Sequence, residues 1–179
     1  MHQDLQEVLF SEEQIDKRVR ELAADLNKEY AGELVYCVGV LKGSGMFMMD
    51  LVRRLDMPVE FDFLIVSSYG SGTISSGKVN IIQDVRIPVE NKHILLVEDI
   101  IDTGNTLQYL KDCFLERKCK SVKIVTMLDK PARRVNGLLA DYVGYAVPDA
   151  FVVGYGLDYA ERYRNLPYIG VLKDSVWKK

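Results

Sequence analysis

The chain has 179 residues, 48% of them hydrophobic and 27% charged, which is the composition of a globular protein. Roughly 150 residues per domain predicts one domain, and a chain of this size buries about 70% of its unfolded surface without disulfides or a structural metal. Collagen-like, coiled-coil and disordered classes are excluded. The net charge of −3 argues against an overall basic field that would bind nucleic acid.

Cysteine usage and the apolar runs indicate the compartment. Cys37, Cys113 and Cys119 are widely spaced and form no CxxC pair, which is typical of reduced thiols in a cytosolic protein. The first residues are polar and acidic, unlike a signal or transit peptide. No apolar run approaches the ~20 residues that cross a bilayer. We therefore expect a cytoplasmic protein with neither membrane nor nucleic acid as a partner.

The first predicted helix follows Ser11, because apolar residues then recur at helical spacing as far as Leu26. Ser11 and Gln14 have the spacing of a capping box. We expect this helix to end near Gly32. The elements expected next are a strand over 33–41, a buried helix over 45–55 and a strand over 58–67.

Strands and helices alternate through the rest of the chain. This order predicts an α/β fold with a central, mainly parallel sheet flanked by helices. Because such sheets bind ligands beyond the carboxyl ends of their strands, the loops at 42–45, 98–106 and 129–131 form the candidate site. The elements expected are strands over 78–85, 92–99 and 121–128, a helix over 102–118, and short strands around Tyr142, Phe151 and Ile169.

The most informative segment is ILLVEDIIDTGNTL, residues 94–107. An apolar strand runs into Glu98, Asp99 and Asp102. Small residues at 103–106 then open a helix, where backbone N–H groups and the helix dipole favour an anion. Acids beside an anion site repel the anion unless a sugar or a divalent cation lies between them. A sugar phosphate satisfies both groups, because its hydroxyls bind the acids and its phosphate binds the helix.

Five segments of the chain resemble one enzyme family. VEDIIDTGNTL resembles the signature with which phosphoribosyltransferases bind 5-phosphoribosyl-1-pyrophosphate. Four further segments resemble the hypoxanthine-guanine phosphoribosyltransferase family, in the family's order from about Val8 to Leu172. They are LKGS at 41–44 (pyrophosphate loop), SSYGSGTISSG at 67–77 (lid), MLDKP at 127–131 (purine-reading lysine) and residues 148–172 (base-binding hood).

The resemblance implies the type I phosphoribosyltransferase fold, built as a single domain over residues 1–179 with a core at about 34–145. Segments 1–12 and about 146–179 would form a small hood over the purine site. Residues 68–78 would form a flexible lid.

The lid segment has a rival interpretation. Gly72–Lys78 nearly spells a P-loop, but Val79 stands where a magnesium-binding Ser or Thr is needed, and a strand follows. A flap that keeps water from a reactive sugar fits better. Ser68 and Tyr69 match the family's lid pair, and a merely flexible hairpin is the alternative.

The resemblance also implies roles at the sugar. Asp102 would be the proton acceptor for the purine. Glu98 and Asp99 would hold the ribose hydroxyls directly or through magnesium, and nearby carboxylates favour the positive charge that develops on the ribose. The cradle for the 5′-phosphate would consist of Asp102, Thr103, Gly104, Asn105 and Thr106.

Further roles fall on the pyrophosphate and the purine. Lys42, Gly43 and Arg164 would bind pyrophosphate, and the family often has a cis peptide before this lysine. Arginine suits phosphate because its planar fork donates two parallel hydrogen bonds. The purine contacts would be Lys130 to O6, Phe151 by stacking, Val152 through its backbone, and Asp158 to the amino group. The implied magnesium ligands are Glu98, Asp99 and Asp158.

On position alone, each of these residues could have an ordinary structural role instead. The acidic strand end can be a solvated one. Thr103 or Asn105 can cap a helix, and Asp158 can be a helix N-cap before YAERY. Lys42 can be a surface lysine in a turn, and Lys130 a lysine at a strand end. Phe151 can be a core aromatic, and Arg164 a solvated charge on a helix.

The implied reaction is magnesium-dependent transfer of the phosphoribosyl group from 5-phosphoribosyl-1-pyrophosphate to N9 of a 6-oxopurine, giving IMP or GMP and pyrophosphate. The family implies homodimers or homotetramers. Ser44 replaces a glycine found in many relatives, and Ala150 stands where others have a lysine. Both leave the choice among hypoxanthine, guanine and xanthine open.

Two rival classes remain. A non-catalytic regulator with this fold, binding nucleotide or RNA, predicts a lost base or pyrophosphate contact and a basic face. Asp102, Lys42 and Arg164 are all present, and the charge is negative. A receiver-like phosphorelay domain needs a lone phosphorylatable aspartate at another strand end, for which Asp62 and Asp84 fit poorly.

Overall fold

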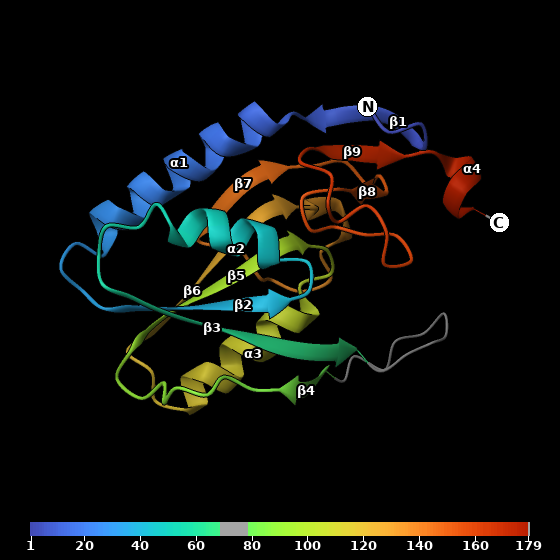
Figure 1. Cartoon of the computed structure of the whole chain (residues 1–179). Helices are drawn as coiled ribbons and strands as arrows, with labels where there is room; N and C mark the ends of the chain where they lie inside the picture. The colour runs from blue at the N-terminus through green and yellow to red at the C-terminus, as the bar shows by residue number, and fades with distance from the viewer. Residues whose placement is uncertain (69–78, 179) are drawn as a thin grey trace.

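A six-stranded sheet in the order β4-β3-β2-β5-β6-β7 forms the centre of the molecule (Figure 1). The computed structural model describes residues 1–68 and 79–178. All neighbouring strands are parallel except β3 and β4, which are antiparallel. The strands are β2 (Val35–Leu41), β3 (Val59–Ser68), β4 (Val79–Gln83), β5 (His93–Ile101), β6 (Ser121–Asp129) and β7 (Tyr142–Ala146).

Helices cover both faces of this sheet. α1 (Glu12–Glu29) and α2 (Gly45–Val52) lie on one face and α3 (Asn105–Glu116) lies on the other. Alternate residues of β5 therefore enter different cores. Leu95 and Val97 pack with α1 and α2, whereas Ile94 and Leu96 pack with α3. Burial on both faces explains why these strands are continuous apolar runs in the sequence.

The predicted capping box at the start of α1 is confirmed. The Gln14 backbone N–H donates to Ser11 Oγ at 3.3 Å, and the Ser11 N–H donates to Gln14 Oε1 at 2.8 Å. Two donors that the helix itself leaves unpaired are thereby satisfied. The helix ends at Glu29, slightly earlier than expected.

A second, antiparallel sheet joins the two ends of the described chain. Its order is β1-β9-β8, and Leu5 lies opposite Leu172. Figure 1 shows this small sheet beside the arrowheads of β6 and β7. It consists of β1 (Leu5–Phe10), β8 (Val152–Val153) and β9 (Ile169–Leu172), followed by the short helix α4 (Asp174–Trp177).

The structure corrects several predicted boundaries. β1 was not predicted, because polar and apolar residues do not alternate along it and only Leu5 is buried. α2 ends at Val52 rather than at 55, and α3 begins at Asn105 rather than at 102, because Gly104 has a φ of 86°. Residues 158–165 form turns, so the alternative of a helix after Asp158 is wrong. The predicted lid at 68–78, Tyr69 included, lies outside the described residues except for Ser68, which ends β3.

In the part of the chain that the structure covers, no helix is both long enough and apolar enough to span a membrane.

Candidate active site

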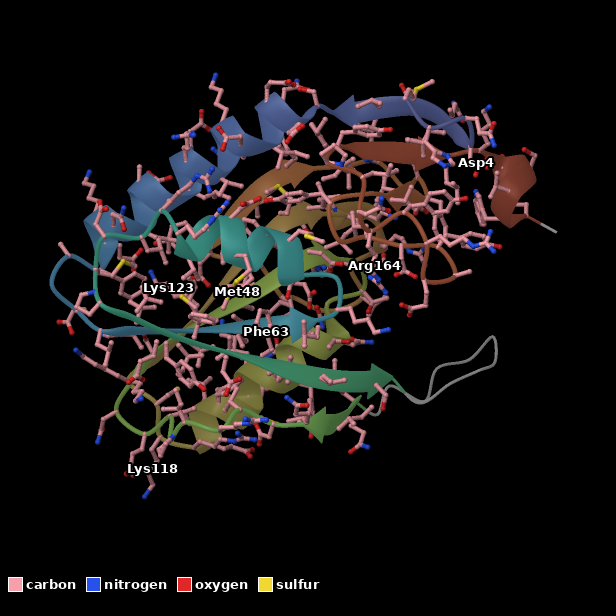
Figure 2. The ribbon with its side chains drawn as sticks, viewed as in Figure 1. Asp4, Met48, Phe63, Lys118, Lys123 and Arg164 are labelled. Atoms are coloured by element: carbon pink, nitrogen blue, oxygen red, sulfur yellow. The ribbon has the colours of Figure 1, made fainter. Side chains whose placement is uncertain are left out.

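The predicted site residues gather at one edge of the large sheet, where β2, β5 and β6 end. The loop at 42–44 follows β2, residues 98–104 end β5, and Lys130 follows β6. Arg164 reaches this edge from the turns between β8 and β9, and Figure 2 labels it near the ends of the central strands. The parallel strands and the turns between β8 and β9 thus bring together residues that lie up to 122 positions apart in sequence, Lys42 and Arg164.

The buried Glu98 and the half-buried Asp99 occupy the end of β5. Glu98 is 8% exposed, and its Oε1 accepts the Asp99 backbone N–H at 3.1 Å. Oδ1 of Asp99 accepts the Ile100 N–H at 2.7 Å. Burial raises the pKa of Glu98 well above its usual value, and the neighbouring Asp99 raises it further. Burial likewise raises the pKa of Asp99. The pair therefore favours a bound proton, cation or hydroxyl.

Glu98→Gln is expected to stabilise the ligand-free protein at pH 7 to 8. A carboxyl group whose pKa is higher in the folded than in the unfolded state stabilises the folded protein while it is protonated. That contribution is complete below the ordinary pKa of 4.5 and is lost as the pH rises through the pKa of the folded state. The amide avoids that loss, so the gain in Tm should grow from pH 4 to pH 8. Thermal unfolding without ligand measures it, with the exposed Glu90→Gln as control. A gain independent of pH contradicts the assignment.

Asp102 lies in the loop between β5 and α3 and contacts two arginines. Its Oδ1 lies 2.8 Å from Arg133 Nε, and its backbone carbonyl accepts a hydrogen bond from Arg134 Nη1 at 2.7 Å. Arg134 also pairs with Asp129. The loop is thus held by Arg133, at the end of η1 (the 3₁₀ turn Pro131–Arg133), and by Arg134 directly after it. Asp102 lines two cavities.

The first cavity, of about 200 Å³, lies at the N-terminus of α3. The predicted phosphate-cradle residues meet here, although Asn105 is not among those that line the cavity. Gly104, rather than Thr103 or Asn105, is the N-cap residue, although Thr103 Oγ1 accepts the Asn105 backbone N–H at 3.4 Å. A Cβ at Gly104 would lie 2.6 Å from Asn136 Oδ1. A helix N-terminus that opens on a cavity suits a phosphate.

The second cavity, of about 280 Å³, lies between β5, β6 and the small sheet. Lys130 is 8% exposed, and its Nζ donates to the Ala150 carbonyl at 2.7 Å. Burial lowers the pKa of Lys130, an effect that Asp102 and Asp149 oppose. The predicted purine contacts that line this cavity are Lys130, Phe151, Val152 and Asp158, together with Asp99, Asp102 and Arg133.

Gly43 lies where three segments meet. A Cβ at this position would lie 1.6 Å from Asp99 Oδ2, and a Cβ at Gly156 would lie 2.0 Å from the Gly43 carbonyl oxygen. The predicted pyrophosphate loop is therefore in close contact with β5 and with the turn after β8. The Leu41–Lys42 peptide is cis. Only a residue without a side chain fits between Asp99 and Gly156.

The two predicted pyrophosphate cations are held by acids. Lys42 Nζ lies 2.9 Å from Glu161 Oε2, and both side chains are exposed. Arg164 donates from Nη1 to the Gly156 carbonyl at 2.7 Å and pairs through Nη2 with Asp158 Oδ1 at 2.8 Å. Asp158 Oδ2 also accepts the Glu161 N–H at 2.9 Å, so it stabilises a turn rather than capping a helix. Arg164 is likewise in a turn, not on a helix.

The site fits a magnesium ion that substrate oxygens help to hold. Among the described residues, no group of three or more His, Cys, Asp or Glu side chains forms a ready metal site. Glu98 and Asp99 are adjacent acids whose pKa values are raised mainly by burial, so a cation bound beside them would favour their charged forms. Magnesium commonly uses one or two carboxylates, waters and substrate phosphates. Asp158 is a poorer ligand while Arg164 holds it.

Sequence reasoning missed Arg133, Asp149, Gly156 and Glu161. Arg133 contacts Asp102 and also lies 3.5 Å from Asp149 through Nη1. Glu161 pairs with Lys42 across 119 positions of sequence. The only local signal was the position of Arg133, three residues after Lys130. Gly156, with a φ of 97°, carried no signal beyond being a glycine.

Comparisons with known proteins agree on one family. A family model described as a phosphoribosyl transferase domain matches residues 6–160. The chain is 57% identical over 178 residues to the hypoxanthine-guanine phosphoribosyltransferase of Bacillus subtilis, covering 99% of each. It is 56% identical over 179 residues to the bifunctional protein TilS/HprT of Listeria innocua, and it spans 28% of that protein's length. A crystal structure of a hypoxanthine phosphoribosyltransferase from Staphylococcus aureus matches with a TM-score of 0.97 at 53% identity, covering 100% of this chain and 97% of that one.

Proposed function

Because the chain belongs to the phosphoribosyl transferase family and has its type I fold, we propose that it acts in purine salvage. It transfers the 5-phosphoribosyl group from 5-phosphoribosyl-1-pyrophosphate to N9 of hypoxanthine or guanine, giving IMP or GMP and pyrophosphate. One observation supports this above others. Asp102 lies between a cavity at a helix N-terminus and a cavity lined by Lys130 and Phe151, so a sugar phosphate and a base can meet beside it.

The sugar end of the reaction depends on the acids of β5. Loss of pyrophosphate leaves positive charge on the ribose ring, and the carboxyl groups of Glu98 and Asp99 stabilise that charge and bind the ribose hydroxyls. The first turn of α3 binds the 5′-phosphate. Mg²⁺, held by these acids with waters and substrate oxygens, would neutralise the leaving group. Asp102 accepts the purine proton.

The pyrophosphate end requires an exchange of partners. Lys42 and Arg164 are paired with Glu161 and Asp158 in the structure. Pyrophosphate carries more charge than either carboxylate and accepts several donors, so it replaces these acids as the partner of both cations. The exposed Lys42–Glu161 pair costs little to break.

The purine end selects the base. Lys130 donates to O6 of a 6-oxopurine, which adenine lacks, while Phe151 stacks on the ring and Val152 offers backbone groups. Asp158 lies where it can reach the purine amino group or a second magnesium. In the proposed arrangement, residues 1–12 and about 146–179 would form a hood over the purine, on a single domain with its core at about 34–145. The proposed lid, residues 68–78 with Ser68 and Tyr69, lies outside the described residues except for Ser68.

Lys130→Ala is expected to reduce kcat/KM for hypoxanthine about 10- to 100-fold, because a hydrogen bond from a charged donor is lost. KM for 5-phosphoribosyl-1-pyrophosphate should change less than threefold. Initial rates with each substrate varied in turn measure both constants. Lys120→Ala, an exposed lysine paired with Glu33, is the control. Equal losses for the two substrates would show that the purine site lies elsewhere.

A non-catalytic nucleotide- or RNA-binding regulator is the second candidate. It predicts a missing base or pyrophosphate contact, yet Asp102, Lys42 and Arg164 all lie at the same sheet edge. The receiver-like alternative fails because Asp62 is used within the fold. Its Oδ1 and Oδ2 accept the N–H groups of Phe63 and Arg86.

The deciding experiment is nucleotide formation from 5-phosphoribosyl-1-pyrophosphate and magnesium with hypoxanthine, guanine, xanthine and adenine in parallel. Turnover of one or more 6-oxopurines with adenine inert is expected, and it would also rank the substrates. Folded protein that turns over no base would favour the regulator, and binding of nucleotides and RNA would then be measured.

We also propose a cytoplasmic homodimer or homotetramer. β3 and α2 leave apolar side chains exposed on one face, with Phe61 and Met46 each 48% exposed. Phe61→Glu is therefore expected to lower the oligomer mass measured by light scattering. Leu139→Glu, at a loop position that is 79% exposed, is the control and should leave the mass unchanged. An unchanged mass for Phe61→Glu would exclude this face as the interface.

A further inference from the structure

Phe151 is held by two aromatic side chains. Its ring centroid lies 5.1 Å from that of Trp177, at an interplanar angle of 31°, and 5.6 Å from that of Tyr159, at 90°. The Trp177 ring is therefore tilted against the Phe151 ring, while the Tyr159 ring meets it edge to face. Such contacts contribute beyond the area that they bury and restrict the ring to one orientation.

Trp177 lies on the side of Phe151 that faces away from the purine cavity. Phe151, Lys130 and Arg133 line both the purine cavity and a second cavity of about 490 Å³, whereas Trp177 lines the second cavity alone. The Phe151 ring is thus part of the wall between the two cavities. One side of its ring is open to the purine, and the other side is supported by the indole.

The position of Trp177 is fixed by the packing of the C-terminal segment. The Leu172 N–H donates to the Phe151 carbonyl at 2.8 Å, and the Lys173 N–H donates to the Asp4 carbonyl at 3.0 Å. The buried indole Nε1 has no hydrogen-bond partner among the described residues. The indole is therefore oriented by its aromatic contact and its packing rather than by a hydrogen bond.

We propose that Trp177 is a positioning residue for purine binding, a role that rests on the proposed function. It forms the outer layer of a stack in which Phe151 is the middle layer and the purine the inner one. Trp177 touches neither substrate. It holds the Phe151 ring in the plane that the base needs, so the base does not have to order that ring on binding.

Trp177→Leu tests this role, because leucine keeps apolar volume but loses the flat ring. KM for hypoxanthine is expected to rise about five- to tenfold, in line with the energy of an aromatic pair. The kcat and the KM for 5-phosphoribosyl-1-pyrophosphate should stay within twofold, and Trp177→Phe should restore most of the loss. Val176→Ala is the matched control. It lies next to Trp177 and packs on the same small core, so it should leave the purine KM unchanged.

A second measurement uses the unchanged protein. Trp177 is the only tryptophan in the chain, so its emission reports on this stack alone. Saturating IMP is expected to shift or quench that emission, whereas 5-phosphoribosyl-1-pyrophosphate alone should have little effect. Calorimetry confirms that each ligand is bound.

The outcomes separate two failures. Wild-type protein that neither turns over a purine nor binds IMP contradicts the proposed function. If the wild-type protein is active, any of three results overturns the role of Trp177. They are an unchanged purine KM in Trp177→Leu, an equal rise of both KM values in that variant, and the same rise of the purine KM in Val176→Ala. Bound IMP without any change in emission overturns it as well, even if Trp177→Leu does not fold.

Discussion

Asp102→Asn is expected to lower kcat by about 10²- to 10⁴-fold, the usual range for removal of a general acid–base group. The amide has nearly the same shape as the carboxylate but cannot accept the purine proton. Because the Asp102 backbone carbonyl still accepts from Arg134, the loop should keep its place. Steady-state rates with hypoxanthine give kcat, and calorimetry with IMP should show binding reduced less than tenfold.

Asp149→Asn is the matched control for that variant. Asp149 also contacts Arg133, at 3.5 Å, and lies 4.0 Å from Lys130, so its amide changes the charge around the same two cations. A merely electrostatic role for Asp102 predicts similar losses in the two variants. Proton acceptance predicts a large loss in Asp102→Asn alone. Unchanged kcat in Asp102→Asn would remove this residue from the mechanism.

The part of the fold that could be predicted is the part that local sequence determines. β5 is an apolar run ended by acids, and its neighbours Val38 and Ile124 come from runs of the same kind. Alternation with helices then implies a parallel sheet, and a parallel sheet brings the loops at 42–45 and 98–104 to one edge. Asp102 and Lys130 could thus be placed in one site before any distance was known.

The contacts that could not be predicted join segments that are distant in sequence. The Lys42–Glu161 pair and the approach of Gly156 to Gly43 each cross more than 100 positions. Strands near Phe151 and Ile169 were predicted, but β1 and its pairing with β9 were missed for the same reason. β1 gains its stability by pairing with β9 at the other end of the chain, and its own residues are largely exposed. Local propensity is a weak guide to such a strand.

The phosphate cradle shows how glycine limits prediction. Gly104 was predicted as a phosphate contact, and the helix was expected to start at Asp102. The left-handed backbone at Gly104 ends the loop and sets the first turn of α3 three residues later. A glycine permits that conformation without requiring it. The neighbouring Asn136 and Arg134 then fill the space beside its Cα, which no local pattern indicates.

Gly43→Ala is expected to lower kcat/KM for 5-phosphoribosyl-1-pyrophosphate about 100-fold, the effect of displacing a reacting group by roughly 1 Å. The new Cβ would lie 1.6 Å from Asp99 Oδ2 and 2.5 Å from its Cγ, so the carboxylate or the loop must move. Asp99 is the easier to shift, because the Gly43 carbonyl packs against Gly156. The methyl group therefore displaces a proposed ribose and magnesium ligand while the backbone stays in place.

Gly45→Ala is the control, two residues further along the same segment. A Cβ there would lie 3.9 Å from Leu41 Cδ2, an ordinary van der Waals contact. As the first residue of α2, it should also tolerate alanine, which favours helix. Both variants should fold, and because of the overlap with Asp99 only Gly43→Ala should have a lower Tm. A large loss in Gly43→Ala alone would show that the lack of a side chain at this position serves the site, whereas equal activity in the two variants would show that Asp99 can move without cost.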